Sequence, residues 1–155
     1  MAPTSTSRAP ASDSRSRTAG PARLVRAPLS FHQLLFRLAI ASVFLRAGLI
    51  KISSWETTLA LFRDEYQVPV VPPATAAVLA TTFELGCSSL LMIGLLTRLA
   101  TLPLLAMIAT IQLFVYPHAW PEHLAWASIL LFLLTRGPGA ISVDHLIAEA
   151  RRHRD

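Results

Sequence analysis

Four long stretches of this sequence consist mainly of apolar residues: 31–52, 74–96, 99–116 and 119–135. Helices of this length are about 26 to 35 Å long, which matches the hydrocarbon core of a bilayer. The fourth stretch is long enough only if residues 120–123 lie at the membrane–water interface, where Trp120 and Trp126 fit an aromatic belt. We therefore predict an all-α fold, a four-helix transmembrane bundle.

The composition excludes a large soluble catalytic domain. Hydrophobic residues make up 53% of the chain and charged residues 15%, whereas about a quarter of the residues of an average soluble domain are charged. The single cysteine, Cys87, excludes an intrachain disulfide, a CxxC redox pair and a cysteine-clustered zinc site. Residues 1–28 are predicted to be a disordered basic tail, residues 29–141 the four-span domain, and residues 142–155 an amphipathic C-terminal segment.

Basic residues are distributed unevenly over the connecting segments. With four spans, both termini lie on one side of the membrane, together with the short turn at Arg98. That side carries most of the cations of a chain whose net charge is +5. The positive-inside rule therefore places both termini in the cytoplasm, in a plasma membrane that we take to be bacterial because 13 arginines accompany one lysine. This orientation explains the basic pI, and nucleic acid is not an expected partner.

Two further helices are expected outside the spans. Residues 55–67 place Trp55, Leu59, Phe62 and Tyr66 on one apolar stripe, which predicts a short helix in the outer interface. Prolines in residues 68–73 prevent its continuation. After the last span, a helix break is followed by Ser142 or Asp144, either of which can cap a final cytoplasmic helix.

Glu84 is the most informative residue, because its position in the second stretch places it about 15 Å deep, near the bilayer midplane. A charged group at that depth costs at least about 2.5 to 3.5 kcal/mol on insertion scales. We expect Glu84 either to carry a proton or to pair with Arg46 or Lys51 of the antiparallel first span. A structural pair and a catalytic, ligand or proton-transfer role both remain open.

Other polar groups lie on the spans and at their outer ends. Arg37 and Lys51 share one face of the first span, near its opposite ends, and we interpret them as interfacial anchors. A polar cluster is expected on the outer half of the bundle, formed by Gln112, Tyr116, His118, Trp120 and His123. His118 and His123 flank a proline in a turn and do not face each other within the bundle, so no metal site is predicted.

A series of short motifs runs through the chain in order. Its members are Arg37, Phe44, Leu45, Gly48, Lys51, Trp55, Glu84, Leu85, Gly86, Gly94, Thr97, Arg98, Gly137, Pro138, Gly139, Ser142 and Asp144. Together they resemble the DoxX family over about residues 31–146. The resemblance implies a small four-helix protein of the plasma membrane, in a superfamily that includes a quinone-reducing component of thiosulfate oxidation. Other relatives are linked to membrane complexes that handle thiol and oxidative stress.

Two functions from different classes follow. The first is a redox-associated membrane subunit, for which no covalently bound cofactor is expected and a quinone is possible, its headgroup lying near Glu84, Gln112 and Lys51. Redox partner proteins or a homo-oligomer would then complete the system, and the chain itself could act as an oxidoreductase subunit. The alternative is a non-catalytic membrane anchor or assembly factor for soluble partners. A small-solute transporter would need oligomerisation, because four spans enclose a small path.

Overall fold

The computed structural model describes residues 22–69 and 71–153. In this part of the chain, all regular secondary structure is helical. The elements are α1 (Ala22–Ser53), α2 (Trp55–Leu61), the π-helical turn η1 (Phe62–Tyr66), α3 (Pro73–Ile93), α4 (Thr97–Thr110), the π-helical turn η2 (Ile111–Val115), the short 3-10 turn η3 (Pro117–Ala119), α5 (Trp120–Arg136) and α6 (Val143–Arg152). The all-α prediction is therefore confirmed for this part of the chain.

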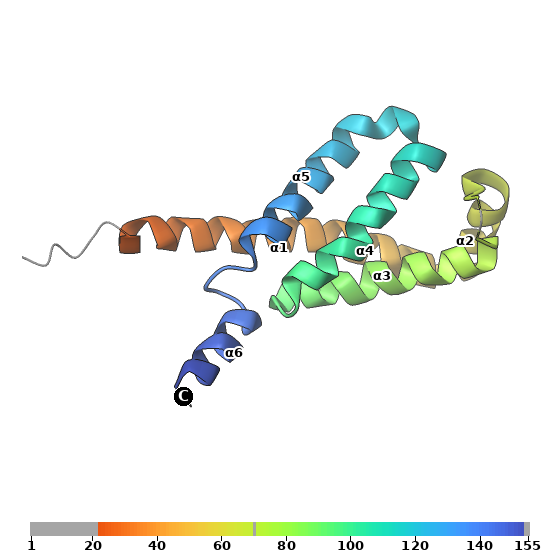
Figure 1. The fold of residues 1–155 in the computed structure, drawn as a ribbon. Helices are drawn as coiled ribbons and strands as arrows, with labels where there is room; N and C mark the ends of the chain where they lie inside the picture. The colour runs from red at the N-terminus through yellow and green to blue at the C-terminus, as the bar shows by residue number, and fades with distance from the viewer. Residues whose placement is uncertain (1–21, 70, 154–155) are drawn as a thin grey trace, which may run out of the picture.

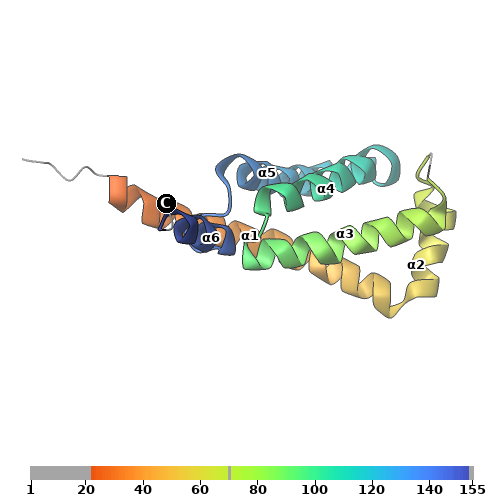
Figure 2. The same ribbon diagram turned by 60° about the horizontal axis from the view of Figure 1, so that its bottom comes forward.

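The long helices form two crossing pairs. Helix α1 packs along α3, and α4 packs along α5, with the second pair lying over the first (Figures 1 and 2). The core between the pairs contains Phe44, Leu91, Leu104 and Leu130, each at most 3% exposed. The face of α1 that the sequence predicts to pack on a neighbour is the buried one, because Ala41, Phe44 and Gly48 all lie in this interface.

Within the described residues, two helical segments are long and apolar enough to cross a membrane, Pro73–Ile93 and Thr97–Val115. They correspond to the second and third predicted spans. Helix α5 has 17 residues, which lies at the short end of the range for a transmembrane helix. Helix α1 has 32 residues and includes Arg37, Arg46 and Lys51. Spanning by these two helices therefore remains a prediction.

Helix α1 begins earlier than the sequence suggests. Residues 22–28, predicted to belong to the tail, are helical in the structure. The rest of the predicted tail, residues 1–21, lies outside the described residues. The helix predicted for residues 55–67 is present as α2 followed by η1, and it lies at one end of the bundle beside the connection between α4 and α5 (Figure 1). Its location in a membrane interface remains a prediction.

The C-terminal helix α6 lies at the opposite end, near α1 and the turn between α3 and α4 (Figure 2). Ser142 caps it as predicted, since its hydroxyl oxygen accepts a hydrogen bond from the His145 amide at 3.2 Å. Asp144 reaches back to the start of α4, where its two carboxylate oxygens accept from the Leu96 and Thr97 amides at 2.8 and 3.1 Å. This pair of bonds fastens α6 to the bundle and satisfies two free amides of a helix N-terminus.

Candidate functional site

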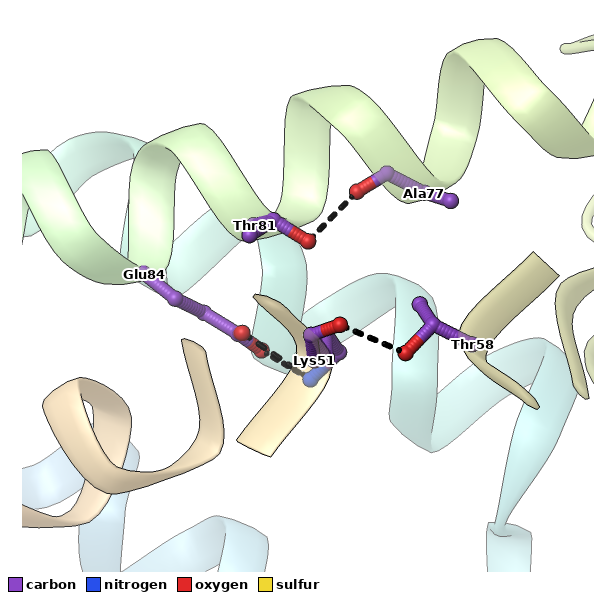
Figure 3. Close-up of polar contacts among 5 residues, drawn as sticks. All are labelled: Lys51, Thr58, Ala77, Thr81 and Glu84. Carbon is purple, nitrogen blue, oxygen red and sulfur yellow. Dashed lines mark hydrogen bonds and ion pairs between the residues drawn. The ribbon is translucent and has the colours of Figure 1, made fainter. Parts of the chain in front are cut away.

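Lys51 and Glu84 form an ion pair between α1 and α3. The Lys51 Nζ atom donates to Glu84 Oε1 at 2.8 Å and to Oε2 at 2.9 Å, and the two side chains point toward each other across the helix interface (Figure 3). The Glu84 side chain is 4% exposed and that of Lys51 is 19% exposed. Of the alternatives considered for Glu84, the structure contains the pair with Lys51.

Close approach of the two helices makes this contact possible. A Cβ atom added at Gly48 of α1 would lie 2.8 Å from the Leu85 side chain and 3.2 Å from the Glu84 Cβ atom, so only glycine fits without a shift. Thr58 of α2 donates its hydroxyl hydrogen to the Lys51 carbonyl oxygen at 3.1 Å. The Thr81 hydroxyl, one turn from Glu84, bonds to the Ala77 carbonyl at 2.8 Å and so is not free to bond the carboxylate (Figure 3).

The ion pair lies in the wall of a cavity of about 570 Å³ between α3 and α4. Most of the lining is apolar, and the charged members of the wall are Lys51 and Glu84. The lining residues from α3 and α4 include Leu79, Ala80, Phe83, Leu102, Pro103, Ala106 and Met107. A cavity of this size, apolar with a few converging polar groups, is typical of a site for a small organic molecule.

The two π-helical turns line the end of the cavity that lies nearest to α2. Phe62 and Tyr66 come from η1, and Tyr116 follows η2 directly. The Tyr66 and Tyr116 rings are in edge contact, with centroids 5.9 Å apart. The Tyr116 hydroxyl donates to the Glu65 carboxylate, and this bond raises the pKa of Tyr116. π-helical turns inside α-helices occur frequently at functional sites.

A comparison with known protein families adds to this geometry. The model of the DoxX family matches residues 32–117, more than half of the 155-residue chain. The chain belongs to the DoxX family. No curated protein and no solved structure matches it. Family membership and the two apolar helices support a membrane protein. The matched region contains both residues of the Lys51–Glu84 pair and all of the residues that line the cavity.

Some predicted site residues of this DoxX protein lie elsewhere. Of the two predicted partners of Glu84, Arg46 is exposed on α1, and Lys51 forms the ion pair. Gln112 does not line the cavity and instead bonds His123 Nδ1 at 2.7 Å and the Pro117 carbonyl at 2.8 Å.

The predicted outer polar cluster is therefore divided. His123 is 5% exposed and lies against the Trp126 ring, whereas His118 and Trp120 are exposed at the surface. Tyr116 is the member that reaches the cavity. Within the described residues, no group of three or more His, Cys, Asp or Glu side chains could hold a metal ion. Cys87 is buried and unpaired.

The interpretation of Arg37 as an interfacial anchor is wrong. Its side chain is 1% exposed, and Nη2 donates to the Ile141 carbonyl at 2.7 Å. The segment after α5 folds back over it, held by Gln33, whose amide donates to the Gly137 carbonyl at 3.1 Å. The interpretation of Lys51 as an anchor is also wrong, because its ammonium group is bonded to Glu84.

The other motif residues have structural positions. Gly94 and Gly139 have positive φ, and a Cβ atom at either would collide with the side chain of Arg37 or Gln33, respectively. Gly137 has a φ of 80° and Pro138 follows it directly, which ends α5. Arg98 lies at the start of α4, where Nη2 donates to the Thr135 carbonyl at 3.4 Å. Gly86 has no neighbour within 4 Å of the position that a Cβ atom would occupy.

Sequence reasoning named Tyr116 as a candidate site residue but missed Phe62 and Tyr66, which line the same end of the cavity. The ring contacts of Phe62, Tyr66 and Tyr116 and the bond to Glu65 join η1 to the residue that follows η2. A signal was present, because Phe62 and Tyr66 belong to the apolar stripe of the predicted interfacial helix. That stripe indicates which face is covered, and only the fold indicates that the cavity lies beneath it.

Proposed function

We propose that this DoxX protein is a multi-pass plasma-membrane subunit that binds the headgroup of a quinone in the cavity beside Lys51 and Glu84. The observation that carries the proposal is a mainly apolar cavity between two membrane-compatible helices, with one buried ion pair in its wall. A quinone combines an apolar body with two carbonyl oxygens that accept hydrogen bonds, and this chemistry corresponds to the lining.

The donor set supports this assignment. An ammonium group has three N–H donors. Lys51 donates two hydrogen bonds, of 2.8 and 2.9 Å, to the two carboxylate oxygens of Glu84. One N–H therefore remains to donate to a carbonyl oxygen in the cavity. Glu84 fixes the position of the ammonium group, and its carboxylate can accept a proton from it or from a bound molecule. Lys51 would thus orient the ligand and Glu84 would hold Lys51.

A bound quinone supplies two-electron, two-proton redox chemistry. Because the chain has one cysteine, it has no dithiol of its own, and electrons would come from a partner protein. Exclusion of water by the apolar walls strengthens the hydrogen bonds of the polar groups that remain in the cavity. The chain's own residues would therefore bind and orient the quinone, and a partner would exchange electrons with it.

The arrangement of charges supports a membrane orientation with both ends in the cytoplasm. The described part of α1 begins at the end of the bundle where α6 and the turn between α3 and α4 lie (Figures 1 and 2). Arg98, Arg136, Arg151 and Arg152 belong to segments at that end. The other end carries fewer basic residues, Arg63 of η1 and Lys51 in the last turn of α1, together with the acidic Glu56, Asp64 and Glu122. This asymmetry follows the positive-inside rule for four spans.

Binding of decylubiquinone to the purified protein in mild detergent tests the proposal. Glu84→Gln removes the charge that fixes Lys51, and Ala80→Phe fills the cavity from α3. Loss of a hydrogen bond to a charged group costs about 1.5 to 3 kcal/mol, so we expect binding to weaken by about 10- to 100-fold. Isothermal titration calorimetry gives the dissociation constants.

Matched controls separate the site from general effects. Glu122→Gln makes the same chemical change on the exposed start of α5, and Ala74→Phe adds a ring at an exposed position in the first turn of α3, outside the cavity wall. Both should bind decylubiquinone like the parent protein. Absence of binding by the folded parent, or unchanged binding by both cavity variants, contradicts the proposal.

The anchor or assembly function is a second candidate, favoured by one observation. Leu146 of α6 is 62% exposed and Ile147 is 40% exposed, although α6 is predicted to face the cytoplasm. Deletion of residues 1–26 and, separately, Leu146→Glu should then remove co-purifying soluble proteins while quinone binding is unchanged. An unchanged set of co-purifying proteins in both variants counts against this candidate.

A further inference from the structure

A second cavity lies at the opposite end of the bundle from α2 and η1. Its volume is about 350 Å³, and it lies between the start of α4 and the end of α5. It is lined by Leu96, Arg98, Leu99, Arg136, Gly137, Pro138 and Asp144. None of these residues belongs to the site proposed above, so a ligand in this second cavity does not depend on quinone binding.

Two arginines, Arg98 and Arg136, line this cavity. Arg98 uses one Nη2 donor for a long bond of 3.4 Å to the Thr135 carbonyl, which leaves most of its five N–H donors unused. The Arg136 side chain makes no hydrogen bond or ion pair with any described residue. Arginine donors in this fork arrangement bind phosphate oxygens with two bonds at once.

The carboxylate in the wall does not neutralise the two arginines by pairing with them. Asp144 forms no ion pair with either arginine among the described residues. Its two oxygens accept the amides of Leu96 and Thr97 at 2.8 and 3.1 Å. Two arginines against one carboxylate leave a positive balance, and both guanidinium groups remain available to an anion.

Apolar side chains adjoin the charged groups. Leu96 is 52% exposed and Leu99 is 61% exposed, and both lie at the first turn of an apolar helix that is long enough to cross a membrane. A ligand with an anionic head and an apolar body would contact both kinds of surface together. Basic pockets between membrane helices on the cytoplasmic side are suited to anionic lipid headgroups.

We propose that Arg98 and Arg136 form a binding site for the phosphate of an anionic phospholipid, whose acyl chains lie against Leu96 and Leu99. The lipid would join the start of α4 to the end of α5 at the cytoplasmic boundary. Occupancy of this site would strengthen contact between the two helices that pair over α1 and α3.

Native mass spectrometry with dioleoylphosphatidylglycerol tests the site in the full-length protein. The double variant Arg98→Gln, Arg136→Gln should bind this lipid roughly 25-fold more weakly, about fivefold for each arginine removed. The single variant Arg136→Gln removes a side chain that bonds to no described residue, so its folding should be unaffected, and it should show the fivefold loss alone. The matched control Arg151→Gln, Arg152→Gln removes the same charge from α6, outside the cavity, and should bind like the parent.

Two further measurements distinguish the lipid from other ligands. Dioleoylphosphatidylcholine, which has no net charge, should bind the parent protein as weakly as it binds the double variant. Inorganic phosphate should not displace the bound phosphatidylglycerol at equal concentration, because it lacks the acyl chains. The proposal is overturned if Arg136→Gln and the double variant retain the lipid like the control, or if phosphate displaces it fully.

Discussion

Removal of one partner of the Lys51–Glu84 pair should destabilise the protein, because the other charge stays buried without a partner. When both charges are removed, the loss of stability should be smaller than the sum of the two single losses. Breaking a buried ion pair from one side costs about 3 to 5 kcal/mol, because the remaining charge is left without compensation. The two single variants leave different groups behind. Lys51→Met leaves a carboxylate that is 4% exposed, and Glu84→Gln leaves an ammonium group that is 19% exposed.

The difference in exposure sets the expected order of the two variants. The Glu84 side chain is only 4% exposed, so Lys51→Met should lower the free energy of unfolding by about 3 to 5 kcal/mol, because it leaves a buried carboxylate without its partner. In Glu84→Gln, the amide oxygen still accepts a hydrogen bond from the ammonium group, and the longer lysine side chain can extend toward water. We therefore expect a smaller loss of about 1 to 3 kcal/mol.

The double variant Lys51→Met, Glu84→Gln removes both charges and completes a double-mutant cycle. Its loss should be smaller than the sum of the two single losses, with a coupling energy of about 1 to 3 kcal/mol. Reversible unfolding in mixed micelles, followed by tryptophan fluorescence, measures all four proteins. Trp126 suits this readout because its ring contacts Phe44 in the core.

Exposed residues provide the controls for this cycle. Arg46→Met removes a cation from the exposed side of α1, and Glu122→Gln removes an anion from the surface of α5. Each should change the free energy of unfolding by less than about 0.5 kcal/mol. Additive losses, or a loss in Arg46→Met equal to that in Lys51→Met, would refute the assignment of Lys51 as the partner of Glu84.

Two further predictions concern the close contact of Gly94 with Arg37 and the hydrogen bond between Tyr116 and Glu65. Gly94→Ala should destabilise the protein by at least about 1 kcal/mol, because its Cβ atom would lie 1.7 Å from Arg37 Nη1 at a φ of 72°; Gly86→Ala, with nothing within 4 Å, should be neutral or stabilising in the same unfolding assay. An ultraviolet absorbance titration should find that Tyr116 ionises above the ordinary value of about pH 10, since its bond to Glu65 raises its pKa, and that Glu65→Gln lowers this pKa. The stabilisation by this bond should be present below about pH 10 and lost as the pH rises through the raised pKa; an unchanged Tyr116 titration in Glu65→Gln would contradict the assignment.

Helix positions could be predicted from the sequence because they depend on local properties. Long apolar stretches and glycine or proline breaks place α3, α4, α5 and α6 within a few residues of their observed ends. The need for a partner at Glu84 could also be predicted, since a buried charge is costly in any fold.

The identity of the partner depended on helix phase. Arg46 and Lys51 are about 7.5 Å apart along α1, and either side chain is long enough to approach Glu84. Lys51, however, shares the face of α1 that contains Phe44 and Gly48 and packs on α3. Arg46 lies on the other side and is exposed. Depth in the membrane alone left both residues as possible partners of Glu84, whereas the helix face that packs on α3 leaves only Lys51.

Other parts of the site depend on contacts between distant segments. Arg37 resembles an anchor in its own helix, and it is buried because residues near Ile141 fold over it. Gln112 lies in a π-helical turn, whose wider turn changes which side of the helix a residue faces. In the structure, Gln112 therefore bonds to His123 of α5 and does not line the cavity.

Photolabelling with an azido-quinone tests the proposed ligand site most directly. The protein in lipid nanodiscs is irradiated with the probe, and the labelled peptides are identified by mass spectrometry. We predict labels on residues that line the cavity, such as Phe83 of α3 and Met107 of α4, with loss of labelling in Ala80→Phe or in excess decylubiquinone. Labels confined to exposed faces of α5 or α6, or labelling that neither the variant nor the competitor reduces, would contradict the account.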